Sequence, residues 1–187
     1  MAFDNFKKVV TQVLQLDYIG SIVFGNGSVQ TIAFRGNYGA FSDYTTQTIS
    51  STTTAYKIAI GQTDEAVGVA CSAGRMTVAE TGVYNFQWSG QFANTGVADG
   101  DAYVWLRKNG TDIIGSTGLI SIPAKHGSVA GHSIYGWNFV MSLTAGDYLE
   151  LWWSAETTSV TIDTYAVGST PTRPSTASVV ATLTQVR

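Results

Sequence analysis

Two long segments of the chain alternate between apolar and polar side chains, and this alternation constrains the fold more than any other feature. In residues 83–93, one side carries Tyr84, Phe86, Trp88 and Phe92, and the other carries Asn85, Gln87, Ser89 and Gln91. In residues 133–143, one side carries Tyr135, Trp137, Phe139, Met141 and Leu143. A period of two is typical of an antiparallel strand with one buried face.

Shorter β-like segments and tight turns surround these two strands. The segments are residues 54–60, 67–72, 76–79, 102–107, 119–122, 148–153, 160–167 and 178–186. Asn109-Gly110 is a strong hairpin signal, and Ala145-Gly146-Asp147 is a second turn. Roughly eight to ten strands with frequent turns predict an all-β, antiparallel sandwich or jelly roll. No helical pattern interrupts them, which argues against a parallel α/β sheet.

The N-terminal part differs in pattern. Five apolar residues follow helical spacing, and they are Phe6, Val9, Val10, Val13 and Leu14. The alternative is a β-branched segment that extends as a strand or arm. Residues 19–24 and 29–34 flank a Gly25–Ser28 turn and predict a hairpin, and a Thr-rich stretch of linker-like composition follows. The predicted organisation is an N-terminal arm at residues 1–50, with a short helix and a β-hairpin, and a head domain at 51–187.

The composition excludes several classes of protein. Only 12% of residues are charged, the net charge is −3, and no basic run is present, so we expect no nucleic-acid partner. Cys71 is the single cysteine, which rules out an intrachain disulfide. The N-terminus lacks the pattern of a signal peptide, and no apolar run approaches the ~18 residues of a membrane span. We therefore expect folding in a cytoplasm without secretion.

Candidate catalytic and metal-binding groups are few. His126 and His132, with Ser128 or Ser133, supply residue types of a Ser-His-Asp catalytic triad. No Gly-x-Ser-x-Gly elbow supports such a triad. One Cys and two His do not supply a zinc site. Asp99 and Asp101 could contribute to a calcium loop, although an acidic hairpin turn is the simpler interpretation, and Asp64-Glu65 is expected in a solvated loop. The sequence therefore predicts a non-enzymatic protein with no cofactor.

Three motifs occur in the order and spacing of one domain family. They are Gly82-x-Tyr84-x-Phe86, then Leu106-x-x-Asn109-Gly110, then Leu143-x-x-Gly146-Asp147-x-Leu149-x-Leu151. Over residues 52–187, the chain resembles the globular-head family of complement proteins and their tumour-necrosis-factor-like relatives. The resemblance implies a trimeric jelly roll that binds partners and performs no chemistry. The family usually ends in a Phe-x-Gly-x-Leu strand, whereas residues 178–183 here read SVVATL, which puts the central strand at the trimer axis in doubt.

Bulky side chains occupy both faces of some strands, as with Trp152 beside Trp153, and Tyr103 and Trp105 beside Val104 and Leu106. An isolated sandwich would expose one such face, and large apolar patches mark association. The expected residues of the trimer interface or core are Tyr84, Phe86, Trp88, Tyr103, Trp105, Trp137, Trp152 and Trp153. The alternative is a monomer in which loops or the arm cover the second face.

A narrower likeness concerns the Thr-rich stretch after Tyr38–Phe41 and residues 168–174 before the final Val-rich strand. Both resemble virion proteins of marine and cyanobacterial tailed phages. This implies a trimeric capsid decoration (cement) protein located in the virion, whose arm docks on a major capsid or tail protein through Phe6, Val9, Val10, Val13 and Leu14. The alternative is a receptor-binding fibre tip, which would bind a host glycan or receptor through loops Asn94–Asp101 and Pro123–His132. A third reading is a hydrolase that acts on host polysaccharide.

Overall fold

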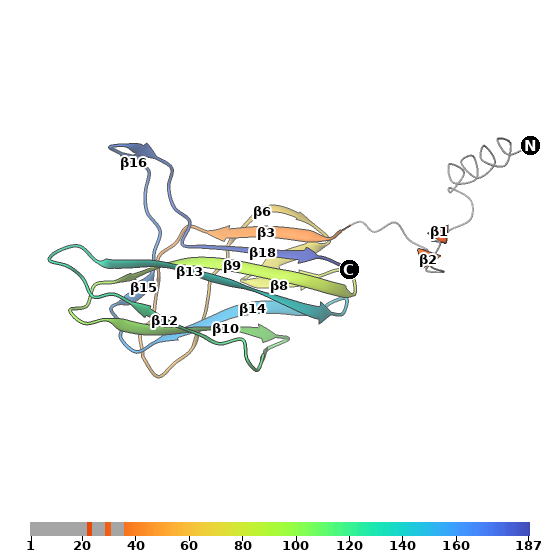
Figure 1. The fold of residues 1–187 in the computed structure, drawn as a ribbon, viewed down its shortest axis with the longest axis horizontal. Helices are drawn as coiled ribbons and strands as arrows, with labels where there is room; N and C mark the ends of the chain where they lie inside the picture. The colour runs from red at the N-terminus through yellow and green to blue at the C-terminus, as the bar shows by residue number, and fades with distance from the viewer. Residues whose placement is uncertain (1–21, 24–28, 31–35) are drawn as a thin grey trace, which may run out of the picture. The chain divides into compact units, whose positions relative to one another are not determined.

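The computed structural model describes residues 22–23, 29–30 and 36–187 of the chain (Figure 1). The chain divides into two units, Met1–Arg35 and Gly36–Arg187. In the first unit, β1 (Ile22–Val23) and β2 (Val29–Gln30) pair antiparallel, as expected for the predicted hairpin. The predicted helix, with Phe6, Val9, Val10, Val13 and Leu14, lies outside the described residues.

The second unit, the head, is built from two antiparallel sheets of seven strands each. The first, here called the β9 sheet, contains β3 (Tyr38–Asp43), β4 (Gln47–Thr48), β6 (Gln62–Val67), β9 (Gly82–Asn94), β13 (Gly131–Leu143), β15 (Val160–Ile162) and β18 (Val179–Gln185). The second, the β10 sheet, contains β5 (Tyr56–Lys57), β7 (Val69–Ser72), β8 (Arg75–Val78), β10 (Gly100–Lys108), β11 (Thr111–Asp112), β12 (Gly118–Ile122) and β14 (Tyr148–Ala155). The described residues contain no helix, so the predicted all-β, antiparallel architecture is confirmed.

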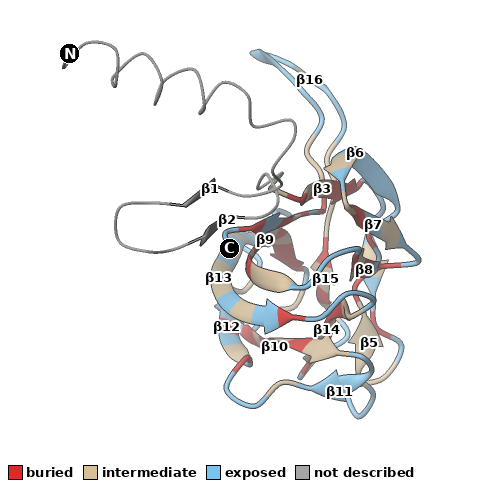
Figure 2. Cartoon of the chain, turned by 90° about the vertical axis from the view of Figure 1, so that its right-hand side faces the viewer, coloured by how far each residue is buried: buried red, intermediate tan, exposed pale blue. Residues whose placement is uncertain are grey.

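The core lies between the two sheets (Figure 2). Tyr84 and Phe86 of β9 are completely buried, as are Leu151 and, within 1%, Trp153 of β14. Their neighbours Asn85, Gln87 and Trp152 point outward and are more exposed, which confirms the predicted sidedness of both strands. Glu150 also lies on the outward side of β14, but it is buried there. The alternation produces this arrangement because successive side chains of a strand point to opposite faces.

Two of the three motif turns contact each other at one end of the β10 sheet. Asn109 and Gly110 have φ angles of 52° and 81°, as a two-residue hairpin between β10 and β11 requires. The Asn109 side chain accepts a hydrogen bond from the Tyr148 backbone N–H (2.9 Å) and donates one to Asp147 Oδ1 (2.7 Å). The Asn-Gly hairpin and the Gly-Asp turn therefore stabilise each other, although they are far apart in the sequence.

Asp147 makes this contact dependent on pH. Hydrogen bonds from Lys108, the Thr144 N–H and Asn109 lower the pKa of Asp147 from 3.8 to about 2. A lowered pKa stabilises the folded state above the unfolded value, and this stabilisation is lost as the pH falls through the folded value. We expect Asp147→Asn to lower the free energy of unfolding by about 1 kcal/mol at pH 7, a figure reduced for solvent screening. In chemical denaturation, the difference in free energy of unfolding between the wild type and Asp147→Asn should shrink between about pH 4 and 2. A difference that stays constant would contradict the stabilising role of the Asp147 carboxylate.

The structure changes some of the expected segment boundaries. The head begins at Gly36, because β3 pairs with β18 and β4 pairs with β15, whereas residues 36–50 were expected to belong to the arm. Asp64-Glu65 was expected in a loop, but both residues lie in β6, which pairs with β3. The strand expected over residues 160–167 ends at Ile162. The chain then leaves the sheet in a protruding hairpin with the small strands β16 (Gly168–Ser169) and β17 (Thr172–Arg173) (Figure 1).

Candidate interaction surfaces

The outer face of the β9 sheet carries no formal charge over three adjacent strands, β13, β9 and β18. None of the residues of β9, β13 and β18 is Asp, Glu, Lys or Arg. Three cross-strand rows form the middle of this surface: Gly136–Ser89–Val180, Asn138–Gln87–Thr182 and Val140–Asn85–Thr184. We call this surface, together with Ile134, the uncharged face.

Several apolar side chains are exposed on the uncharged face. Ile134, Val140 and Val180 expose 65%, 62% and 43% of their surface. Among the described strands, β13 pairs only with β9, so its 13 residues form a long free edge beside this face. Exposed apolar side chains among uncharged polar ones, with charges depleted, are typical of the centre of a protein–protein interface. The uncharged face is therefore the surface of the head best suited to association.

The two candidate loops meet at one end of the sandwich. The backbone N–H of Lys125 donates to the Gly96 carbonyl (2.9 Å), and the N–H of Ala124 donates to Asp99 Oδ1 (2.8 Å). These contacts join Asn94–Asp101 to Pro123–His132. Asp99 thus has a structural role in holding the loops together.

The head is entered from the opposite end. Asn37 accepts a hydrogen bond from the Gln185 N–H (2.7 Å), and Gln185 lies opposite Tyr84, near the start of β9. The loops follow Asn94 at the other end of β9, about 40 Å away at 3.3 Å per residue. Gly36, the first residue of the head, therefore lies at the end of the sandwich away from the loops.

The structure divides the eight predicted interface or core residues into three groups. Four of them form part of the core, namely Tyr84, Phe86, Trp88 and Trp153. Trp137 is half-buried and packs edge-on against Trp88 at 4.9 Å between ring centroids. The remaining three are half-buried on the outer face of the β10 sheet, namely Tyr103, Trp105 and Trp152.

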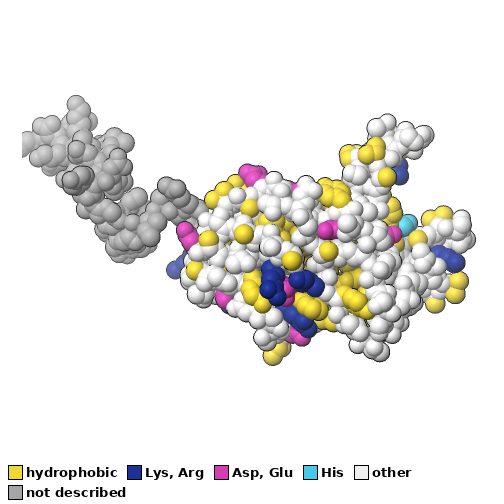
Figure 3. Space-filling model, turned by 180° about the vertical axis from the view of Figure 1, so that it is seen from behind, with side chains coloured by type: hydrophobic (Ala, Val, Ile, Leu, Met, Phe, Trp, Pro, Cys, Tyr) yellow, Lys and Arg dark blue, Asp and Glu magenta, His cyan; other side chains and the backbone are white. Residues whose placement is uncertain are grey.

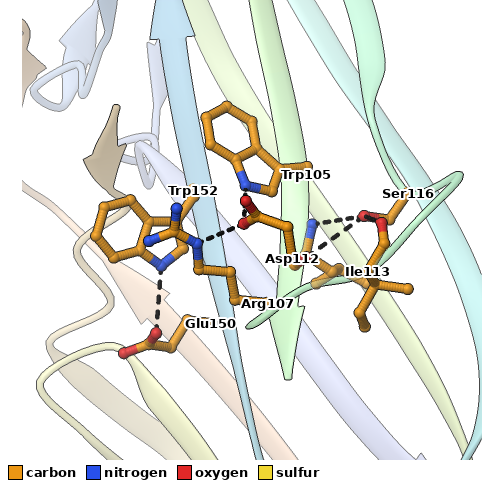
Figure 4. A network of polar contacts seen from close by, with 8 residues as sticks. Trp105, Arg107, Asp112, Ile113, Ser116, Glu150 and Trp152 are labelled. Atoms are coloured by element: carbon orange, nitrogen blue, oxygen red, sulfur yellow. Dashed lines mark hydrogen bonds and ion pairs between the residues drawn. The ribbon is translucent and has the colours of Figure 1, made fainter. Parts of the chain in front are cut away.

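Charged residues lie beside two of these outer aromatic rings, those of Trp105 and Trp152 (Figure 4). The guanidinium of Arg107 lies 3.8 Å from the centroid of Trp152. The indole Nε1 of Trp105 donates to Asp112 Oδ1 (2.7 Å), and Asp112 also pairs with Arg107. The protein's own side chains therefore cover part of the aromatic outer face of the β10 sheet. The sequence pattern had predicted that a neighbouring copy or another segment covers it.

A buried carboxylate lies at the centre of this network. Glu150 is 2% exposed and pairs with Arg75 (Nε to Oε1, 2.9 Å) and Lys57 (Nζ to Oε1, 3.5 Å), while Trp152 Nε1 donates to its Oε2 (3.2 Å). Figure 3 shows a group of Lys and Arg side chains around carboxylates on the molecular surface. We call this surface the cationic–aromatic face; its residues are Lys57, Arg75, Tyr103, Trp105, Arg107, Asp112, Glu150 and Trp152.

No pattern in the sequence indicated this cluster as a site. Alternation places Glu150 on the side of the strand opposite Leu149 and Leu151, and it does not show that the carboxylate is buried there. Arg75 and Lys57 lie on short strands that reach Glu150 only through sheet pairing. A carboxylate on an otherwise aromatic strand face was the only local signal.

The histidines do not form a catalytic site with the candidate serines. His132 Nδ1 lies 2.9 Å from the Tyr165 hydroxyl at the base of the protruding hairpin. Ser133 is its neighbour on β13 and points to the opposite face. His126 lies in an exposed turn, where its backbone bonds to Val129. Within residues 36–187 and the four residues of β1 and β2, no group of three or more His, Cys, Asp or Glu could hold a metal ion, and no helix is long and apolar enough to cross a membrane.

Comparison with known proteins identifies the fold. No protein-family model matches the sequence, and no curated protein matches it. Two solved structures of murine APRIL, at pH 8.5 and pH 5.0, each match with a TM-score of 0.50, over 81% of this chain and 100% of the other. The sequence identities are 11% and 10%, so the likeness concerns the fold alone. The head thus has the predicted tumour-necrosis-factor-like jelly-roll fold, while the trimer and the likeness to phage proteins remain predictions.

Proposed function

We propose that the protein is a non-enzymatic structural component of a tailed-phage virion, a homotrimeric capsid decoration protein. The jelly-roll head is exposed, and the N-terminal arm docks on the major capsid protein or a tail protein. The resemblance of the sequence to phage virion proteins suggests the location. The uncharged face and the joined end loops are surfaces suited to binding, which supports a binding role.

The observation that carries this proposal is that the two ends of the head differ. The chain enters at Gly36 at one end of the sandwich, and the loops Asn94–Asp101 and Pro123–His132 lie at the other. An arm attached at Gly36 can bind the virion surface while these loops point away from it. A decoration protein needs this arrangement, with an anchor and a compact exposed head at opposite ends.

The uncharged face supports trimer formation. Its polar side chains are amides and hydroxyls such as Gln87 and Thr182, which can be buried against identical copies without leaving an unpaired charge. Its exposed valines and isoleucine lose contact with water on association. The native mass is therefore expected at three times 19.9 kDa.

A single charge in the uncharged face tests the trimer. We expect Gln87→Glu to dissociate the trimer at micromolar concentration, because three new carboxylates would be brought together and like charges at an interface cost several kcal/mol. Thr111→Glu, on the other sheet, is the matched control and should remain trimeric. Sedimentation equilibrium measures both masses. A wild-type mass of 19.9 kDa at all concentrations would refute the trimer.

Deletion of residues 1–16 tests the anchor. The truncated protein should still form a folded trimer but should no longer bind capsids, because it lacks Phe6, Val9, Val10, Val13 and Leu14. Cosedimentation with capsids that lack the protein measures binding. Full occupancy by the truncated protein would show that the arm is not the anchor.

A receptor-binding fibre tip is the second candidate, and the joined loops favour it. Val97 and Val129 expose 85% and 62% of their surface on adjacent loops, as contact residues for a host receptor could. The number of copies per virion separates the two functions. Hundreds of copies indicate decoration, and a few dozen or fewer indicate a fibre.

A further inference from the structure

The protruding hairpin, residues 163–178, rises from the β9 sheet on the side away from the β10 sheet (Figure 1 and Figure 2). Both of its legs are bonded to Gln91 of β9. The Asp163 N–H donates to the Gln91 carbonyl (2.7 Å), and the Gln91 N–H donates to the Ser178 carbonyl (2.9 Å). Gln91 pairs with Ile134 of the uncharged face. The protruding hairpin therefore rises from the same face that is proposed to bind neighbouring copies.

Above its base, the protruding hairpin pairs only with itself. Tyr165 bridges Thr176 at the base, where its hydroxyl lies 2.9 Å from His132 Nδ1, and β16 pairs with β17 above them. Nine of the ten residues 166–175 are exposed, and Val167 exposes 68% of its surface. A two-stranded hairpin alone is marginally stable in water. The protruding hairpin is therefore expected to gain stability from a surface outside its own head.

The protruding hairpin is long enough to reach past a neighbouring sheet. Its tip, Thr170-Pro171, lies seven residues from Asp163, which is about 23 Å along an extended strand. Sheets that pack face to face lie only about 10 Å apart. A copy that packs on the uncharged face therefore meets the protruding hairpin.

The length of the uncharged face indicates which part of the neighbour the hairpin meets. The face follows β9 and β13, each of 13 residues, so three copies bury it fully only if their rotation axis runs along these strands. A rotation about such an axis leaves the loop ends of all three copies at the same height. The hairpin leaves β9 at Gln91, three residues or about 10 Å from Asn94, where the first end loop begins. It therefore faces the end loops of the next copy, Asn94–Asp101 and Pro123–His132.

These two surfaces both expose apolar side chains. On the hairpin, Val167 is 68% exposed, and Pro171 and Pro174 are exposed as well. On the end loops, Val97 and Val129 expose 85% and 62% of their surface. Contact between the surfaces removes these side chains from water, which favours association.

The charges of the two surfaces are compatible with contact. Arg173 is the one charged residue among residues 166–175, and none of the ion pairs within residues 36–187 includes it. The end loops carry Asp99 and Asp101 against Lys125, which gives one net negative charge. The hairpin cation therefore approaches a surface of opposite net charge.

We propose that the protruding hairpin of each copy clasps the next copy by lying on its end loops. This inference rests on the proposed trimer, and it adds a contact that lies outside the uncharged face. The contact joins two different surfaces, as the interfaces of a cyclic trimer do. The end of the trimer away from Gly36 is then built from the loops of one copy and the hairpin of another. A receptor that binds at this end contacts two copies at once.

Photo-cross-linking of the purified full-length protein tests the clasp. p-Benzoylphenylalanine at Thr172, an exposed residue near the hairpin tip, should give covalent dimers and trimers on a denaturing gel. Mass spectrometry of the cross-linked peptides should place the second attachment point in residues 94–101 or 123–132. The same group at Thr111, which is exposed on the other sheet, is the matched control and should leave the chains monomeric on the gel.

A shortened hairpin tests how much the clasp contributes to assembly. Replacing residues 166–175 with Gly-Gly leaves Tyr165 and Thr176 joined by a two-residue turn, so both sheets keep their strands. The concentration at which half of the chains are trimeric should rise about tenfold, because Val167 and the two prolines no longer lose contact with water. Sedimentation equilibrium measures this concentration.

Three results would overturn the clasp while leaving the trimer intact. They are a trimeric protein without cross-links from Thr172, cross-linked peptides that lie outside the two end loops, and an unchanged midpoint in the shortened variant. Cross-linking of Thr172 to a capsid protein on virions, with none between copies, would assign the hairpin to the virion surface instead. A wild-type protein that is monomeric at all concentrations would refute the clasp and the trimer together.

Discussion

Replacing Trp153 with alanine should lower the free energy of unfolding by about 3 to 5 kcal/mol. Trp153 is 1% exposed and is one of the largest fully buried side chains in the head. Its ring packs edge-on against Phe92 of the opposite sheet, with 6.4 Å between centroids. Alanine would leave a cavity between the two packed sheets. The sheets cannot close it, because β14 is held by backbone pairing on both sides, with β10 and with β5.

Trp152→Ala is the matched control, since it removes the same side chain one residue earlier on the same strand. Trp152 lies on the outer face, and its replacement removes mainly its contacts with Arg107 and Glu150. We therefore expect the free energy of unfolding to fall by about 1 kcal/mol. Urea denaturation at one fixed protein concentration measures both, since association also contributes to apparent stability. Equal losses in the two variants would contradict the assignment of core and outer faces on β14.

Glu150→Ala should lower the free energy of unfolding by about 2 to 3 kcal/mol. Removing a buried carboxylate leaves Arg75, Lys57 and the Trp152 indole without their acceptor, and breaking a buried pair costs about 3 to 5 kcal/mol. The expected value is smaller because the Arg75 side chain is 54% exposed and regains water contacts. Asp112→Ala is the control in the same network. We expect it to lower the free energy of unfolding by less than about 1 kcal/mol, because Asp112 is 59% exposed.

The effect of Glu150 should also depend on pH. Burial alone would raise the pKa of Glu150, but the Arg75 and Trp152 hydrogen bonds and the Lys57 charge outweigh it and hold the pKa below 4.5. The stabilisation is therefore complete above the unfolded pKa and is lost as the pH falls through the lower, folded value. Denaturation curves of the wild type and Glu150→Ala should converge as the pH falls below about 4.5. If the gap stays constant as the pH falls, the ion pairs are not its cause.

The local pattern predicts long strands well and short polar strands poorly. β9 and β13 were predicted from alternation because each turns one face toward the core along 13 residues, largely buried in β9 and half-buried in β13. β6 was missed because its residues are polar and mostly exposed, and it is held by backbone pairing with β3 rather than by buried side chains. The expected strand at 54–60 shortens to Tyr56–Lys57, because only these two residues pair with β14.

The binding residues were also predicted incompletely, because the pattern of one strand does not show which residues neighbouring strands place beside it. Alternation shows that Trp152 and Trp153 point to opposite faces, but it does not show which face has a partner. Trp153 joined the core, while Trp152 was covered in part by Arg107 from the neighbouring strand. The five apolar residues predicted as the virion anchor lie outside the described residues, so they remain a prediction.

The amino-acid sequence by itself determined the all-β class, the sidedness of the long strands and the position of the Asn109-Gly110 hairpin, because these depend on residues close together in the chain. Only the tertiary structure decided that Glu150 is buried beside two cations, that loops 94–101 and 123–132 meet, and that the uncharged strands lie side by side. Sheet order decides these contacts, since it places strands that are distant in sequence next to each other. Strand order is a property of how both sheets pack together, and no local period encodes it.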